Sequence, residues 1–255
     1  MTTTALELPK ATPFLIKQDY AAYTAEQHAV WAELARRRMP QIERHAAREY
    51  LEGFEFLSLP FDRLPNLATL SAKLQPRTGW NATAVSGFLP GPAFFEMLAA
   101  RRFPTTTTLR GRDSLEYVPE PDIFHDVFGH VPMHAHRVFA DFLAHYGQVC
   151  SRIDDEAILE RIGRMFWYTV EFGLIRQDGE VKVYGSGLIS SNGECSNVIH
   201  RGCEVRPFDL GEVLRTPVKV DEMHHLLFAI ESFDEIYEAM HTLEVRILRG
   251  SRLDD

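Results

Sequence analysis

The segment YVPEPDIFHDVFGHVP, residues 117–132, places two histidines five residues apart in a stretch that also contains prolines and a glycine. On an ideal α-helix, His125 and His130 would point about 140° away from each other. Their imidazoles can meet at one point only if a helix end or a local bulge lies there, and Pro121 and Gly129 give the backbone room for it. Taken alone, such a pair among eleven histidines is more often structural than metal-binding.

A single glutamate, Glu171, lies about forty residues further on, in the apolar segment IGRMFWYTVEFGLI, residues 162–175. Residues 154–174 follow a helical pattern that is apolar on two sides, which is typical of a buried helix. A buried carboxylate needs a partner, because an unpaired charge in the interior is costly. Arg164 is one candidate partner; a metal ion shared with the two histidines is the other.

Two imidazoles and one carboxylate form the ligand set that holds ferrous iron and leaves coordination positions open. The same set also serves a catalytic zinc ion, so spacing alone does not distinguish the two metals. Neither segment holds a cysteine, and the three cysteines of the chain lack a C-x-x-C spacing, which argues against structural zinc and a disulfide framework. Aromatic residues flank the ligands and favour a flat apolar substrate, although core packing explains part of this lining. They are Phe124, Phe128, Phe166, Trp167, Tyr168 and Phe172.

Length and composition predict one ordinary globular domain. The chain has 255 residues, of which 45% are hydrophobic and 25% charged, enough for a single large core. Its net charge of −9 argues against a general binder of nucleic acid or anionic membrane. No apolar run reaches the roughly 20 residues that a membrane span needs, and the N-terminus lacks the pattern of a secretory signal. We therefore expect a soluble protein of the cytoplasm.

The remaining patterns predict a mainly helical fold with a minor β component, of the α+β class. Thr24 and Gln27 form a capping-box pair that predicts a helix start, and Pro40 is the helix boundary expected after it. The β-branched run at 105–108 predicts a short strand. A turn before residues 180–184, which alternate in polarity, predicts a small hairpin.

Three expectations concern the weaker patterns and the domain boundaries. Residues 79–92 and 185–216 are rich in glycine and small polar residues and are expected to be irregular. The last long helix is expected to start near Asp221. Its inward side would carry Leu226, Leu227, Ile230, Phe233 and Ile236. Residues 1–20 are expected to form an N-terminal arm, and residues 21–255 a single domain.

Three motifs, in this order and spacing, closely resemble those of the aromatic amino acid hydroxylases, a family of pterin-dependent enzymes. They are EPDIFHDVFGHVP (120–132), FWYTVEFGL (166–174) and YGSGLISSNGE (184–194). The resemblance extends over residues 18–238 and is strongest to bacterial members that act on phenylalanine. It implies that residues 21–255 are a single catalytic domain of the aromatic amino acid hydroxylase type.

The resemblance implies an iron site and a pterin site. The catalytic Fe(II) is implied to be bound by His125, His130 and Glu171, and a tetrahydropterin such as tetrahydrobiopterin is implied to bind in an adjoining pocket. Asp126 would contact the pterin; the family often has glutamate there, so the carboxylate is one methylene shorter. A glycine-containing loop lets backbone groups reach the polar edge of the pterin, and Phe88 could stack on its ring. The pterin loop is implied to comprise Val85, Ser86, Gly87, Phe88 and Leu89.

The resemblance also implies a pocket for the amino acid substrate. Its residues would be Arg110, Val118, Pro119, Trp167, Gly187 and Ser190. The planar guanidinium of Arg110 suits bidentate binding of a carboxylate. Val118 departs from the threonine of the animal enzymes, which puts hydroxyl assistance to the substrate in doubt. Trp167 resembles the enzymes that act on phenylalanine and tyrosine rather than tryptophan, and Val220 resembles those that act on phenylalanine. The expected reaction therefore uses dioxygen and tetrahydropterin to convert L-phenylalanine to L-tyrosine.

Two other classes of protein remain as alternatives at this point. A zinc hydrolase could use the same three ligands, although no glutamate adjoins a helical histidine pair as in HExxH. A helical binding module could contain the histidines as structural residues. The same mechanism could also act on tyrosine or tryptophan. Because neither the regulatory domain nor the long C-terminal tail of the animal enzymes is recognisable, we expect a monomer that binds small molecules, without nucleic acid or membrane partners.

Overall fold

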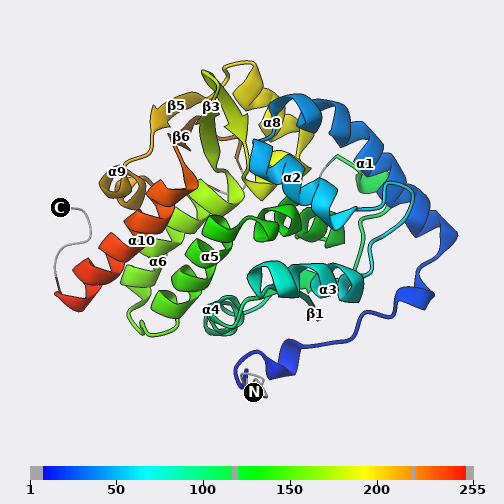
Figure 1. The fold of residues 1–255 in the computed structure, drawn as a ribbon, viewed down its shortest axis with the longest axis horizontal. Coiled ribbons are helices and arrows are strands. Elements are labelled where there is room, and N and C mark those ends of the chain that lie inside the picture. Colours follow the sequence, from blue (N-terminus) through cyan, green and yellow to red (C-terminus); the bar gives the residue numbers. More distant parts are fainter. Residues whose placement is uncertain (1–7, 117–119, 220–221, 251–255) are drawn as a thin grey trace.

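The computed structural model describes residues 8–116, 120–219 and 222–250 of the chain. Helices dominate these residues and two small sheets accompany them, so the expected α+β class is confirmed (Figure 1). The α-helices are α1 (Ala25–His45), α2 (Arg48–Leu57), α3 (Leu67–Thr78), α4 (Gly91–Ala99), α5 (Arg137–Cys150), α6 (Glu156–Phe166), α7 (Ser186–Ser190), α8 (Asn192–Ile199), α9 (Leu210–Arg215) and α10 (Phe233–Leu248). Two π-helical segments are η4 (Phe124–His130) and η6 (Trp167–Glu171). Short 3₁₀-helices are η1 (Thr12–Phe14), η2 (Tyr20–Ala22), η3 (Arg112–Ser114) and η5 (Val131–Ala135).

The strands form two separate sheets. The smaller sheet pairs β1 (Asn81–Val85) with β2 (Arg102–Thr106) in parallel. The larger sheet has the order β4-β3-β6-β5 and contains β3 (Leu174–Gln177), β4 (Glu180–Val183), β5 (Glu204–Pro207) and β6 (Leu226–Ile230). Figure 1 shows the larger sheet at one end of α5 and α10, which pack against each other. Among the described residues, no helix is both long and apolar enough to cross a membrane.

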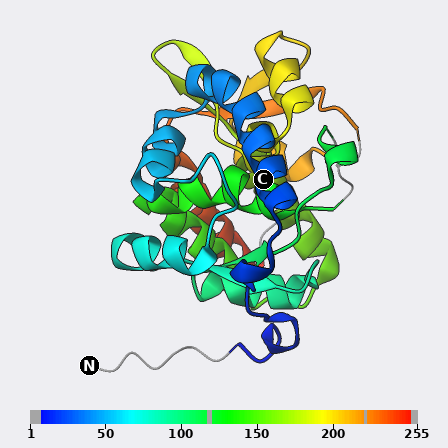
Figure 2. The same ribbon diagram turned by 90° about the vertical axis from the view of Figure 1, so that its right-hand side faces the viewer.

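The N-terminal segment packs onto the smaller sheet and α4. Leu8 and Ala11 are buried together with apolar residues of β1, its following loop and α4. The backbone N–H of Ile16 donates to the carbonyl oxygen of Ala84 at 3.1 Å, which extends the edge of β1. Figure 2 shows the described part of this segment at the lower end of the molecule, leading up into α1. Residues 1–7 lie outside the described part of the chain.

Several expected elements are present, some with other boundaries. Thr24 forms both hydrogen bonds of the capping box with Gln27 at the start of α1. The helix does not end at Pro40, which lies inside α1. Proline has no backbone N–H, so the carbonyl group four residues earlier lacks its usual hydrogen-bond donor. Pro40 is exposed, and water can bind that carbonyl instead. The expected hairpin is the antiparallel pair β3 and β4, and the strand expected at 105–108 is β2, which begins earlier.

Other expectations were wrong. Residues 79–92 contain β1, and residues 185–216 contain α7, α8, β5 and α9. Residues 226–230 are strand β6, and the last helix begins only at Phe233. A run of five apolar residues fits a buried strand as well as a helix, and its position between β3 and β5 decides for the strand. The helix expected over 154–174 ends at η6, and Leu174 begins β3.

A close contact between α4 and α5 gives a prediction on stability. A Cβ atom at Gly147 would lie 2.4 Å from the backbone nitrogen of Ala99 and 2.6 Å from Leu98 Cβ. We expect Gly147→Ala to lower the free energy of unfolding by about 1–3 kcal/mol, because the two helices must separate. Chemical denaturation measures this change.

Gly163 on α6 provides the matched control. A Cβ there would meet nothing within 4 Å, so Gly163→Ala should raise the free energy of unfolding by about 0.5–1 kcal/mol through helix propensity. Equal effects of the two substitutions would contradict the proposed role of the contact.

Candidate metal centre and active site

The histidine pair lies on the π-helical segment η4, residues Phe124–His130. A π-helix closes its hydrogen bonds between residues i and i+5, so residues five apart lie close to one line. His125 Nε2 and His130 Nε2 are 3.2 Å apart as a result. The local bulge that the five-residue spacing requires is therefore present.

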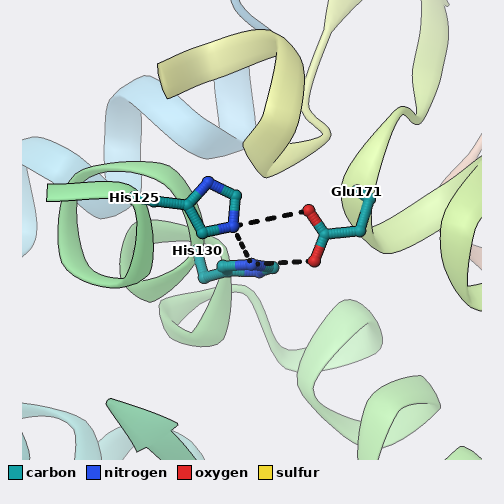
Figure 3. A group of neighbouring side chains, drawn as sticks. All are labelled: His125, His130 and Glu171. Carbon is teal, nitrogen blue, oxygen red and sulfur yellow. Dashed lines mark hydrogen bonds and ion pairs between the residues drawn. The ribbon is translucent and has the colours of Figure 1, made fainter. Parts of the chain in front are cut away.

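Glu171 ends the second π-helical segment, η6, and faces both imidazoles (Figure 3). Its Oε1 atom lies 3.1 Å from His130 Nε2, and its Oε2 atom lies 3.5 Å from His125 Nε2. Arg164, the alternative partner, binds Glu160 on the same helix instead. Glu171 is therefore the buried carboxylate that completes the set with the two histidines.

The distances in this group fit a metal ion. Ligands about 2.1 Å from one ion are about 3.0 Å apart in neighbouring octahedral positions and about 3.4 Å apart in a tetrahedron. The separations of 3.1 and 3.2 Å fall in this range, and the 3.5 Å between His125 Nε2 and the second oxygen of Glu171 lies just above it. Two imidazole nitrogens and a carboxylate held this close favour a cation between them, because their lone pairs otherwise repel one another. The donor set suits ferrous iron.

Helix α7 holds two of the three ligands through serine hydroxyl groups. Ser186 Oγ donates to Glu171 Oε2 at 2.6 Å. Ser190 Oγ donates to the carbonyl oxygen of Ser186 at 2.8 Å and lies 2.9 Å from His125 Nδ1. Because its proton is used there, the Ser190 oxygen accepts from His125 Nδ1–H, which leaves Nε2 free to bind a metal. Ser190 was expected in the substrate pocket, and the structure places its hydroxyl group on His125. The sequence patterns did not predict the contact of Ser186 with Glu171.

Burial and charge set the protonation states needed for metal binding. Burial raises the pKa of Glu171, but His130, His125 and the hydrogen bond from Ser186 outweigh this and hold it at about 2. Burial also lowers the pKa of His125 below its usual value. At neutral pH the group therefore presents a carboxylate and a neutral imidazole, the forms that ligate a metal.

A second group in the described chain, His145, His241 and Glu244, also brings three candidate ligand atoms together. Glu244 is already paired with His145 at 2.8 Å and with Arg152 at 3.2 Å. The positive charge of Arg152 opposes a cation there, and His241 is exposed. The group around Glu171 is therefore the better metal centre.

Asp126 connects the metal centre to the smaller sheet. It is buried, and its Oδ2 atom accepts from both the backbone N–H and the hydroxyl group of Thr106, each at 2.7 Å. Thr106 pairs with Val85 in the parallel register of β1 and β2. Burial raises the pKa of Asp126. The expected pterin loop, residues 85–89, therefore begins close to Asp126.

The expected pterin loop has an open backbone and an exposed ring. Val85 and Leu89 are buried in the small core below α4, so their side chains do not line an open site. The backbone N–H of Ser86 donates to the carbonyl oxygen of Phe14. Gly87 has a backbone φ of 147°, a conformation that favours glycine. Phe88 is 85% exposed. The groups that this loop can offer a planar ligand are therefore its backbone and the exposed ring of Phe88.

A continuous series of aromatic rings runs from α4 to the larger sheet. Phe94 contacts Phe166 edge to face, with ring centroids 5.5 Å apart. Phe166 contacts Trp167, and Trp167 stacks on Phe172 with centroids 6.1 Å apart and planes at 18°. Phe94 is partly buried and lies on α4, the helix after the pterin loop, a position that the sequence patterns did not single out. Three of the six aromatic residues expected as a lining, Phe166, Trp167 and Phe172, belong to this series. The other three are core residues: Phe124 and Phe128 stack on each other, and Tyr168 packs on Phe228.

The remaining pocket residues fall into three groups. The Arg110 guanidinium binds the buried Asp122 carboxylate through two bonds of 2.8 Å. Gly187 lies against Phe172, since a Cβ there would approach its ring to 2.6 Å. Val118, Pro119 and Val220, which were expected to contact or select the substrate, lie outside the described residues.

The π-helical histidine pair and the glutamate of a second π-helix define the class: a mononuclear two-histidine, one-carboxylate centre in a mainly helical domain. The family of biopterin-dependent aromatic amino acid hydroxylases matches residues 16–253, and the chain belongs to this family.

Comparisons with individual proteins agree with this assignment. The chain is similar to phenylalanine-4-hydroxylase of Chromobacterium violaceum, at 40% identity over 90% of this chain and 77% of the relative. It is equally similar to phenylalanine-4-hydroxylase of Mesorhizobium japonicum, at 40% identity over 94% and 88% of the two chains. The crystal structure of the C. violaceum enzyme with bound iron(III) and 7,8-dihydrobiopterin superposes with a TM-score of 0.87, at 35% identity over 100% of this chain and 97% of that chain.

Proposed function

We propose that the chain is a phenylalanine 4-monooxygenase, which uses dioxygen and a tetrahydropterin to convert L-phenylalanine to L-tyrosine at a ferrous ion. The observation that carries this proposal is the group of His125, His130 and Glu171, whose ligand atoms lie within 4.8 Å of one another. The relatives named phenylalanine-4-hydroxylase, and the related structure that holds iron and dihydrobiopterin, support the substrate and both cofactors.

The proposed metal ligands are His125 Nε2, His130 Nε2 and Glu171. Bound ferrous iron would supply the redox chemistry by which dioxygen and pterin hydroxylate an aromatic ring. The protein's own contribution is to keep Glu171 ionised and to fix the tautomer of His125 through Ser190. The partly buried Trp167 and the buried Phe172 form an apolar wall, which would exclude water and pack against the substrate ring.

Arg110 is proposed to bind the substrate carboxylate. Asp122 occupies its Nε and one Nη2 proton, and the carbonyl oxygen of Leu115 accepts from Nη1 at 3.3 Å. A guanidinium has five N–H donors, so one donor remains on each terminal nitrogen. This pair suits a carboxylate that arrives on the opposite side from Asp122.

The pterin is proposed to bind between loop 85–89 and Asp126. Backbone groups of Ser86, Gly87 and Phe88 would meet its polar edge, with the carboxyl group of Asp126 close by. Phe94 is a second candidate for ring stacking, because it belongs to the series of aromatic rings that runs from α4, whereas Phe88 projects into solvent.

The substrate pocket is proposed to include Gly187 and Ser190, together with Val118 and Pro119.

We further propose that residues 21–255 are one catalytic domain with residues 1–20 as an arm, and that the protein is a cytoplasmic monomer. The buried contacts of Leu8 and Ala11 support an arm that packs on the domain. The net charge of −9 supports small molecules as its partners, rather than nucleic acids or anionic membranes. Light scattering coupled to size-exclusion chromatography tests the monomer.

Product analysis tests the function. Iron-loaded protein receives dioxygen, a tetrahydropterin and one of phenylalanine, tyrosine or tryptophan in separate reactions. We expect tyrosine from phenylalanine, and none when either iron or pterin is omitted. Turnover of only tyrosine or tryptophan would overturn the substrate assignment while leaving the mechanism. Bound iron without any product would overturn the function itself.

A further inference from the structure

The short helix α7 requires partners for the carbonyl groups at its end. The last four carbonyls of any helix lack partners within it, and a buried helix end must find them elsewhere. The carbonyl of Ser186 accepts from Ser190 Oγ, and that of Gly187 accepts from the N–H of Ser191. Of the last four carbonyls, residues 187–190, those of Leu188, Ile189 and Ser190 remain for partners outside the helix. Leu188 and Ile189 are fully buried, so water is not an easy substitute at their carbonyls.

Arg38 of α1 supplies these two partners. Its Nε atom donates to the carbonyl oxygen of Ile189 at 2.9 Å, and its Nη2 atom donates to that of Leu188 at 3.1 Å. The planar guanidinium thus spans two consecutive carbonyls, a geometry that a lysine ammonium cannot reproduce. The two contacts join residues about 150 positions apart in the sequence.

The surroundings of Arg38 show that its charge is not placed there to form an ion pair. The residue is only 4% exposed. Within the described chain its side-chain hydrogen bonds go to the two carbonyls of α7, Gln41 and Asn192, and the buried thiol of Cys195 also interacts with it. Burying a guanidinium without a carboxylate is costly. Within the described chain, Arg38 is the side chain that donates to these two carbonyls at the end of α7.

We propose that Arg38 is a positioning residue of the metal centre, acting through α7. Arg38 fixes the end of α7, and α7 carries Ser186, which holds Glu171, and Ser190, which holds His125. A Cβ at Gly129 of η4 would approach Ser186 Cβ to 3.0 Å, so α7 packs tightly on the histidine segment as well. A shift of this helix would move both supporting hydroxyl groups together. This inference rests on the proposed metal centre.

The test replaces Arg38 with methionine, which keeps the length of the stem and removes the donors. Removing a group that hydrogen-bonds to a metal ligand typically weakens metal binding by about 10–100-fold. Arg38 acts one step further out, so we expect the dissociation constant for Co²⁺, measured by chelator competition, to rise about tenfold. The visible absorption spectrum of bound Co²⁺ should change, because the orientation of His125 changes.

Arg37→Met is the matched control. Arg37 is the neighbouring residue on α1, half exposed, and paired with Glu33 and Glu116 on the surface. This variant should bind Co²⁺ like the unmodified protein, with the same spectrum. Arg38→Lys should restore part of the affinity, because an ammonium reaches one of the two carbonyls.

A readout without metal separates this inference from the proposed function. In metal-free protein, nitrogen-15 NMR should show the Nδ1–H tautomer of His125, and Arg38→Met should change its population or chemical shift while Arg37→Met does not. Where Arg38→Met fails to fold, Arg38→Lys is compared instead, and an intermediate loss is expected. Unchanged Co²⁺ affinity, spectrum and tautomer in a folded Arg38 variant would overturn the proposal. Failure of the unmodified protein to bind metal would contradict the metal centre, and the NMR comparison would still decide whether Arg38 positions His125.

Discussion

Replacing Glu171 by alanine is expected to abolish metal binding and phenylalanine hydroxylation together. Glu171 is the sole carboxylate in the group with His125 and His130, and both of its oxygens face the imidazole nitrogens. Removing a hydrogen-bond partner of a ligand costs about 10–100-fold in metal affinity, and removing the ligand itself must cost more. The two histidines would remain as a weak site. Metal content after anaerobic loading and tyrosine formation measure the two losses.

Glu160→Ala provides the control for this experiment. Glu160 lies on α6, the helix that leads into η6, and its carboxylate pairs on the surface with Arg164. The same chemical change at that position should leave iron content and hydroxylation unaltered. Hydroxylation that persists in Glu171→Ala without bound metal would contradict the iron mechanism. Full metal binding in this variant would show that Glu171 is not a ligand.

The sequence predicts the metal centre mainly through its three family motifs, because the histidine pair alone is more often structural; two features of the ligands add a signal of their own. A histidine pair at a spacing of five requires a distorted helix, and η4 is such a helix. An isolated glutamate in an apolar segment requires a partner, and the structure supplies His130 and His125. The supporting residues carry no such signal. Ser186 and Arg38 are ordinary polar residues in the sequence, and only the approach of α7 to η4, η6 and α1 gives them a role.

The errors at the strands have a common physical cause. Local patterns predicted the start of α1 and the hairpin of β3 and β4, where capping and turn residues act on their neighbours. They failed at β1 and β6, whose hydrogen bonds go to distant strands. Residues 81–85 are small and partly polar, and their pairing with residues 102–106 makes them a strand. Pairing with distant strands decides the secondary structure of such segments, and the periodicity of the sequence holds no information on that pairing.

The buried pair of Arg110 and Asp122 gives the second large expected effect, this time on stability. Asp122 is 4% exposed, and its two oxygens accept from Arg110 Nε, Nη2 and backbone N–H and from the backbone N–H of His125. We expect Asp122→Ala to lower the free energy of unfolding by about 3–5 kcal/mol, because it leaves a buried guanidinium without its partner. The KM for phenylalanine should rise as well, since Asp122 orients the arginine proposed to bind the substrate. Chemical denaturation and steady-state kinetics measure the two effects.

Asp141→Ala is the matched control for the cost of losing a carboxylate beside an arginine. Asp141 lies 2.6 Å from Arg101, but the two side chains are 38% and 32% exposed. Water can solvate the remaining arginine, so this substitution should cost less than about 1 kcal/mol.

A double substitution of Arg110 and Asp122 by methionine and alanine should destabilise the protein less than Asp122→Ala alone, because no unpaired charge remains. If the double variant were the less stable of the two, the loss would come from packing or from the backbone of His125, and the unpaired charge of Arg110 would not be its cause.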